Sequence, residues 1–138
     1  MELDRRDFNK LLGVGAASTL LPNIAMAQSD ISTFYDSADA MDLAAAVRKG
    51  DILPAELLEE AIRRAQIAER ALNILTMDHY YLARQQVLDD IPDGPFSGVP
   101  FLLKDMGVTL KGTITTNGSR LLANNVARHT AELVKRQQ

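Results

Sequence analysis

The chain of 138 residues contains no cysteine, so disulfide bonds, thiolate metal sites and a cysteine nucleophile are excluded. Its two histidines, His79 and His129, lie far apart in the sequence, which argues against a histidine metal site. There is also no excess of basic charge, because 15 basic residues face 18 acidic ones and no basic run exceeds two. We therefore expect no metal ion and no nucleic acid as a partner.

No apolar run reaches the roughly 20 residues that a membrane-spanning helix needs. Residues 11–27 come nearest, but polar residues and a proline interrupt them. Basic residues precede this run, and Ala25-Met26-Ala27 ends it with the small residues of a cleavage site. This order predicts a secretory signal over residues 1–27. A membrane anchor and an amphipathic helix of a cytoplasmic protein are the alternatives.

The N-terminal signal also has a more specific pattern. Arg5 and Arg6 are followed by Phe8 and Lys10, and the mildly apolar run behind them contains glycine. This resembles the twin-arginine export signal of bacteria. The resemblance implies the twin-arginine export machinery as a partner and a periplasmic or secreted location.

The rest of the chain alternates between helical and apolar extended patterns. Residues 28–36 are polar and predict a flexible lead-in. Helices are expected from Ser37 or Asp39 to about Lys49, from Pro54 to about Leu72, over residues 79–88, and from about Thr130 onward. Short strands are expected over residues 73–77, 99–103 and 108–110. Helices and isolated apolar strands in alternation favour an α/β fold.

The second expected helix has two distinct faces. An apolar stripe contains Leu57, Ala61 and Leu72, among others, at helical spacing. On the opposite side, Glu59 with Arg63 and Glu60 with Arg64 stand four residues apart in the favoured order. We interpret this second side as a solvated, charged face.

The most informative residue is Lys104, which follows the apolar run 99–103. A cation at the end of a buried strand is costly unless it is paired, or unless the site keeps it neutral. A neutral buried lysine can act as a general base. From the residues alone, a lysine that extends to solvent is the competing interpretation.

The flanking residues distinguish these alternatives. Residues 94–105, Gly-Pro-Phe-Ser-Gly-Val-Pro-Phe-Leu-Leu-Lys-Asp, resemble the segment of amidase signature enzymes that ends in their catalytic lysine. Residues 112–119 are similar to the stretch rich in threonine, glycine and serine that follows it. The resemblance extends over residues 37–138. It implies the N-terminal part of a mixed sheet covered by helices, an α/β fold that is incomplete in this chain.

The resemblance also implies a mechanism. The family hydrolyses small-molecule amides with a Ser–cis-Ser–Lys triad and without a cofactor, and Lys104 matches its general base. Residues 105–138 contain no counterpart of the Gly/Ser-rich loops that supply the two serines. We therefore expect the N-terminal fragment of an exported amidase that is inactive by itself. The alternative is a non-catalytic truncated product or a helical interaction module.

Overall fold

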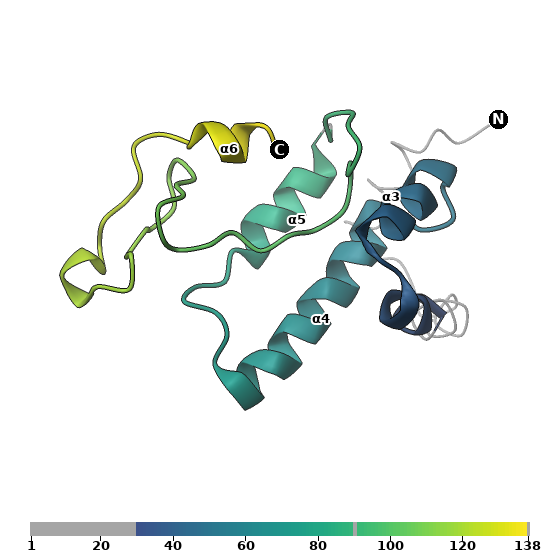
Figure 1. Ribbon diagram of the computed structural model, residues 1–138, viewed down its shortest axis with the longest axis horizontal. Helices are drawn as coiled ribbons and strands as arrows, with labels where there is room; N and C mark the ends of the chain where they lie inside the picture. Colours follow the sequence, from purple (N-terminus) through teal and green to yellow (C-terminus); the bar gives the residue numbers. More distant parts are fainter. Residues whose placement is uncertain (1–29, 90, 138) are drawn as a thin grey trace, which may run out of the picture. The chain divides into compact units, whose positions relative to one another are not determined.

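The computed structural model describes residues 30–89 and 91–137, and the chain divides into two compact units between Pro100 and Phe101. The described part of the first unit contains a helical segment at 30–37, α3 (Ala40–Lys49), α4 (Pro54–Leu72) and α5 (Tyr80–Leu88) (Figure 1). The second unit contains the 3₁₀ helix η1 (Arg120–Leu122) and the short helix α6 (Glu132–Lys135). None of the helices in the described ranges is long and apolar enough to cross a bilayer.

The segment 30–37 is helical, so the expectation of a flexible lead-in over 28–36 is wrong from residue 30 onward. Residues 28 and 29, and the signal predicted over 1–27, lie outside the described residues. The helix forms because Ile31, Phe34 and Tyr35 share one face at helical spacing. Ile31 is buried in the core with Leu43 and Leu57, and the two aromatic rings pack against that cluster. The apolar face outweighs the polar composition.

Helix α3 begins and ends as its sequence predicts. The Asp39 carboxylate accepts hydrogen bonds from the backbone N–H groups of Met41 and Asp42, and the Asp42 carboxylate accepts one from the backbone N–H of Asp39. This capping box supplies acceptors for donors that the first helical turn leaves unpaired. At the other end Gly50 adopts a left-handed conformation and terminates the helix.

Helix α4 starts at Pro54, whose missing N–H costs nothing at a first helical position. Its bounds match the prediction, but of the predicted apolar stripe only Leu57 is buried. Leu57, Leu58 and Ile62 are buried, whereas Leu72 is 72% exposed. The core cluster therefore packs on the N-terminal half of the helix.

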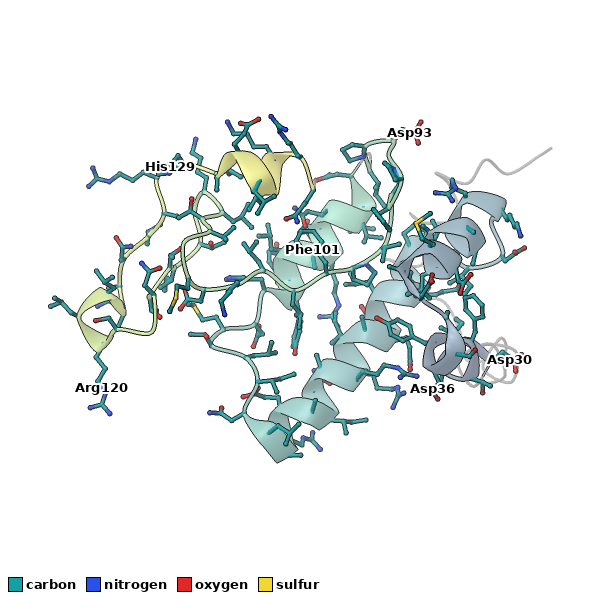
Figure 2. All side chains as sticks on the ribbon, viewed as in Figure 1. Asp30, Asp36, Asp93, Phe101, Arg120 and His129 are labelled. Carbon is teal, nitrogen blue, oxygen red and sulfur yellow. The ribbon has the colours of Figure 1, made fainter. Side chains whose placement is uncertain are left out.

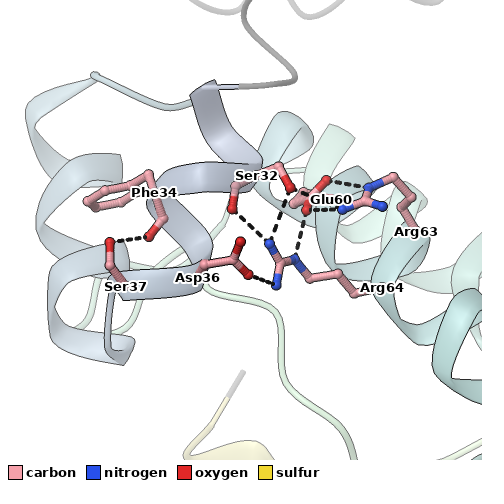
Figure 3. A network of polar contacts seen from close by, with 7 residues as sticks. All are labelled: Ser32, Phe34, Asp36, Ser37, Glu60, Arg63 and Arg64. Atoms are coloured by element: carbon pink, nitrogen blue, oxygen red, sulfur yellow. Dashed lines mark hydrogen bonds and ion pairs between the residues drawn. The ribbon is translucent and has the colours of Figure 1, made fainter.

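The interpretation of α4's charged side as fully solvated is wrong for Glu60, which is completely buried. Its carboxylate accepts hydrogen bonds from Arg63 at 2.6 and 2.8 Å and from Arg64 at 2.7 Å (Figure 3). Arg64 in turn donates to the Asp36 carboxylate and to the backbone carbonyl of Ser32, and it stacks over Tyr35. The two guanidinium groups pair with the carboxylate and fasten the helical segment 30–37 to α4.

Helix α5 lies beside α4 and is joined to it by a bidentate pair. Arg84 donates to the two carboxylate oxygens of Glu59 at 2.6 and 2.8 Å. The spacing in the sequence suggests a pair between Glu59 and Arg63. In the structure Glu59 pairs with Arg84 of the neighbouring helix instead. His79 is the N-cap residue, and the helix buries none of its own residues.

A tight turn joins α5 to the apolar run. Gly98 has a φ of 79°, and a Cβ atom there would stand 3.0 Å from side-chain atoms of Pro54 and Val47. Both the backbone conformation and the close packing therefore require glycine at this position. The next residue, Val99, packs against the core cluster, and Arg48 donates to the carbonyl of Pro95 at 2.7 Å.

The structure contains no regular strand among the described residues, so the strands expected over 73–77, 99–103 and 108–110 do not form. An apolar run becomes a strand only when neighbouring strands accept its backbone hydrogen bonds. In the second unit, segments 109–115 and 125–131 come close to this arrangement. Gly112 donates to Ala127, Ala127 to Thr113, and Thr115 to Asn125, around an isolated antiparallel bridge between Ile114 and Val126.

Candidate functional site

Lys104, the candidate base, is solvent-exposed. The apolar residues before it do not shield it, since Phe101 (labelled in Figure 2) is 51% exposed and Leu102 is 69% exposed. Within the described ranges, no side chain forms an ion pair or a hydrogen bond with its ammonium group. The expectation of a buried lysine is thus wrong for this structure. Lys104 is exposed because residues 99–103 do not form part of a sheet in the described structure.

Asp105, the next residue, is held firmly. Its carboxylate accepts a hydrogen bond from the backbone N–H of Thr116 at 2.8 Å and another from the Thr116 hydroxyl. Within the described residues the Asp105 carboxylate is bonded to Thr116 and forms no ion pair with Lys104. The carboxylate links residues that are 11 positions apart in the sequence.

The electrostatics of Asp105 follow from these contacts. Hydrogen bonding by the Thr116 hydroxyl lowers the pKa of the Asp105 carboxyl, and the backbone N–H groups of Thr116, Asn117 and Gly118 add to this against the opposing effect of burial. Because the folded pKa is depressed, ionised Asp105 stabilises the fold above the ordinary aspartate pKa. This contribution is lost as the pH falls through the lowered folded value.

The loop 116–118 is shaped to hold a carboxylate. Asn117 and Gly118 have φ angles of 50° and 72°, which turn successive N–H groups toward one side of the backbone. Gly118 donates to the Thr116 hydroxyl oxygen at 3.1 Å, and Gly107 donates to the Asn117 side chain at 3.2 Å. Segments 105–107 and 116–118 are therefore joined at several points.

The sequence pattern did not reveal this link. Residues 112–119 were identified only as a stretch similar to one in amidase signature enzymes, without a partner inside the chain. The available signal was a Lys-Asp pair followed at a short distance by Thr-Thr-Asn-Gly, a composition that favours turns with inward N–H groups. Ser119 takes no part in the link, and its backbone N–H donates to the carbonyl of Thr116.

Comparison with known proteins places most of the chain in one family. The profile of the family described as Amidase matches residues 56–138. The chain is 35% identical over 100 residues to the 6-aminohexanoate-cyclic-dimer hydrolase of Paenarthrobacter ureafaciens, covering 71% of the chain and 20% of that protein. It is 38% identical over 104 residues to a glutamyl-tRNA(Gln) amidotransferase subunit of Deinococcus radiodurans, covering 72% and 21%.

A third relative is the lipoamidase of Enterococcus faecalis, 36% identical over 103 residues, which cover 73% of the chain and 14% of that protein. No solved structure matches the chain. The chain spans about a fifth or less of the length of these three relatives.

Proposed function

This chain belongs to the amidase family, and from that membership we propose that it supplies the general base, Lys104, to an enzyme that hydrolyses carboxamide C–N bonds. The observation that carries the proposal is the Gly-Val-Pro-Phe-Leu-Leu-Lys-Asp sequence at 98–105 inside the matched range 56–138. The anchored Asp105 supports it, because a fixed neighbour gives Lys104 a defined backbone direction.

The chemistry requires two serines besides Lys104, and we assign neither to residues 105–138. Neutral Lys104 takes a proton from a bridging serine, which takes one from the nucleophilic serine. The nucleophilic oxygen attacks the amide carbon, the C–N bond breaks, and the amine leaves with a proton. Water then cleaves the acyl ester and regenerates the serine. The net reaction converts an amide and water into a carboxylic acid and an amine.

A base must be largely neutral when it acts, and exposure works against this for a lysine. We propose that residues 99–103 join a mixed sheet as a strand when further sequence of the amidase domain is present, and that this sheet covers Lys104. The exposed side chains of Phe101 and Leu102 are the apolar surface that such a sheet would bury.

The substrate class follows from the relatives only in general terms. Their names refer to a cyclic dimer of 6-aminohexanoate, to a subunit of a glutamyl-tRNA(Gln) amidotransferase, and to a lipoamidase. Two of these names, amidotransferase and lipoamidase, refer to an amide group. We therefore propose a small-molecule amide as the substrate.

Amide turnover is the direct test of this function. The protein expressed from the complete coding sequence that contains this chain is incubated with 6-aminohexanoate cyclic dimer, lipoamide and a chromogenic anilide. We expect release of the amine from at least one of them, and a covalent acyl adduct by mass spectrometry after rapid acid quenching. If none of the three amides is turned over and none leaves a covalent adduct, the proposal is contradicted.

The exposure of Lys104 favours a second candidate, a non-catalytic product that retains only the N-terminal part of an amidase. This candidate predicts no acyl adduct under any condition, together with dye binding by exposed apolar surface and a weakly cooperative unfolding transition. Adduct, dye-binding and unfolding measurements on one preparation therefore separate the candidates.

We further propose that residues 1–27 direct twin-arginine export to the periplasm or the exterior, on the pattern Arg5-Arg6 with Phe8 and Lys10. Replacing Arg5 and Arg6 together with lysine keeps the charge but removes the paired guanidinium groups. We expect the protein to remain in the cytoplasm, as measured by cell fractionation and immunoblotting. Lys49→Arg is the control, and unchanged export of the double variant would refute the assignment.

A further inference from the structure

Asp105 directly follows the proposed base, Lys104, in the chain. A contact that holds Asp105 can therefore also affect the backbone at Lys104. The Asp105 carboxylate is directed at Thr116 and not at the Lys104 ammonium, with which it forms no ion pair. Thr116 contributes both its backbone N–H and its hydroxyl to the same carboxylate. The peptide that joins Lys104 to Asp105 is thus adjacent to a doubly hydrogen-bonded group.

The direction of the hydroxyl hydrogen bond is also settled. The Thr116 oxygen accepts the N–H of Gly118 at 3.1 Å, and a hydroxyl has one proton to donate. That proton is therefore directed to Asp105. The loop presents only donors to the carboxylate, so an amide side chain, whose NH₂ group would meet these donors, fits poorly.

A second contact holds the same segment from the other side. Gly107 donates to the side chain of Asn117 at 3.2 Å. The segments 109–115 and 125–131, which flank this loop in the sequence, are paired by backbone hydrogen bonds, among them one from Thr115 to the carbonyl of Asn125. Asp105 and Gly107 are thus both hydrogen-bonded to the loop 116–118.

We propose that Asp105 is the positioning residue of Lys104: its hydrogen bonds to Thr116 fix the peptide between residues 104 and 105 and thereby the direction in which the lysine side chain leaves the backbone. The role of Lys104 as the base rests on the proposed function. The fixation itself rests only on the contacts within residues 105–118. A misplacement of a catalytic group by about 1 Å can lower a rate by about 100-fold.

The test combines backbone order and kinetics. In the 138-residue chain, ¹⁵N relaxation gives order parameters at Lys104, Met106 and Gly107. We expect rigid values, above about 0.8, in the parent chain and values below about 0.6 in Asp105→Asn. In the complete protein, Asp105→Asn should lower kcat by about 100-fold with little change in KM.

Four further variants make the outcome specific. Thr116→Ser keeps both donors and should preserve order and kcat, whereas Thr116→Val removes the hydroxyl and should lower both. Asp93→Asn, in an exposed turn, is the matched control and should change neither. Asp105→Ala, which removes every hydrogen-bonding atom of the side chain, should lower order and kcat at least as far as Asp105→Asn.

The outcomes separate this inference from the proposed function. Lower order with unchanged kcat would make the contact purely structural and overturn the inference. Unchanged order in Asp105→Asn would overturn it as well. If the parent protein turns over no amide, the proposed function fails. The inference is then decided by the order of Lys104 alone, and a loss of order in Asp105→Asn but not in Asp93→Asn supports it.

Discussion

Replacing Lys104 with alanine is expected to lower kcat/KM for amide hydrolysis by about 1,000-fold or more in the complete protein. General base catalysis contributes on the order of 100- to 10,000-fold by itself, and groups that act as one proton relay lose most of their effect when any member is removed. The initial rate on the amide found to be the best substrate is the measurement. KM should change little, because the proposed role of Lys104 is to transfer a proton and not to bind the substrate in its ground state.

Two companion variants determine whether charge or proton transfer is lost. Lys104→Arg keeps the positive charge, but a guanidinium stays protonated at every working pH and cannot accept a proton from serine. We expect it to be as inactive as the alanine variant. Lys111→Ala removes an exposed lysine in the same unit and should leave the rate unchanged. Retention of more than about a tenth of the activity in Lys104→Ala would contradict the assignment.

Replacing Glu60 with glutamine is expected to lower the free energy of unfolding by about 2 to 3 kcal/mol. Removing one partner of a buried ion pair typically costs about 3 to 5 kcal/mol, because the other charge is left uncompensated. The effect should be smaller here, since the side chains of Arg63 and Arg64 are 45% and 28% exposed and water can solvate them. Urea denaturation of the 138-residue chain, followed by circular dichroism, gives the value.

Glu59→Gln provides the matched control, one residue away on the same helix. Its partner is Arg84 on α5, and both side chains are close to half exposed. Exposed pairs of this kind contribute about 0 to 1 kcal/mol. If the two glutamine variants lost equal stability, burial would not be what distinguishes Glu60, and the network in Figure 3 would have no special role.

Helices α3 and α4 could be predicted from the sequence because their signals are local. The start of α3 is set by Asp39 and Asp42, its end by Gly50, and the start of α4 by Pro54. Each of these signals acts within a few residues. The environment of Glu60 could not be predicted in this way. A charged residue on a helix is expected to face solvent, and the partners of its neighbour Arg64 come from segment 30–37, about 30 residues earlier in the chain.

The candidate site was predictable only in part. The motif identified Lys104 as the residue to examine, but the apolar run 99–103 was interpreted as a buried strand. Burial depends on neighbours that an isolated run does not specify. The contact between Asp105 and Thr116 was missed for the same reason. It joins two polar loops, and polar loops have no periodicity from which a partner can be inferred.

The fastening of segment 30–37 to Arg64 has a consequence for how the chain is made. Ser32 and Asp36 are synthesised 32 and 28 residues before the guanidinium that binds them. At about 5 to 20 residues per second, a ribosome needs at least about 1.5 seconds to add that stretch. Throughout this interval Ile31 and Phe34 have no α4 to pack on. The earliest part of the described chain to be synthesised therefore cannot dock until α4 has followed it.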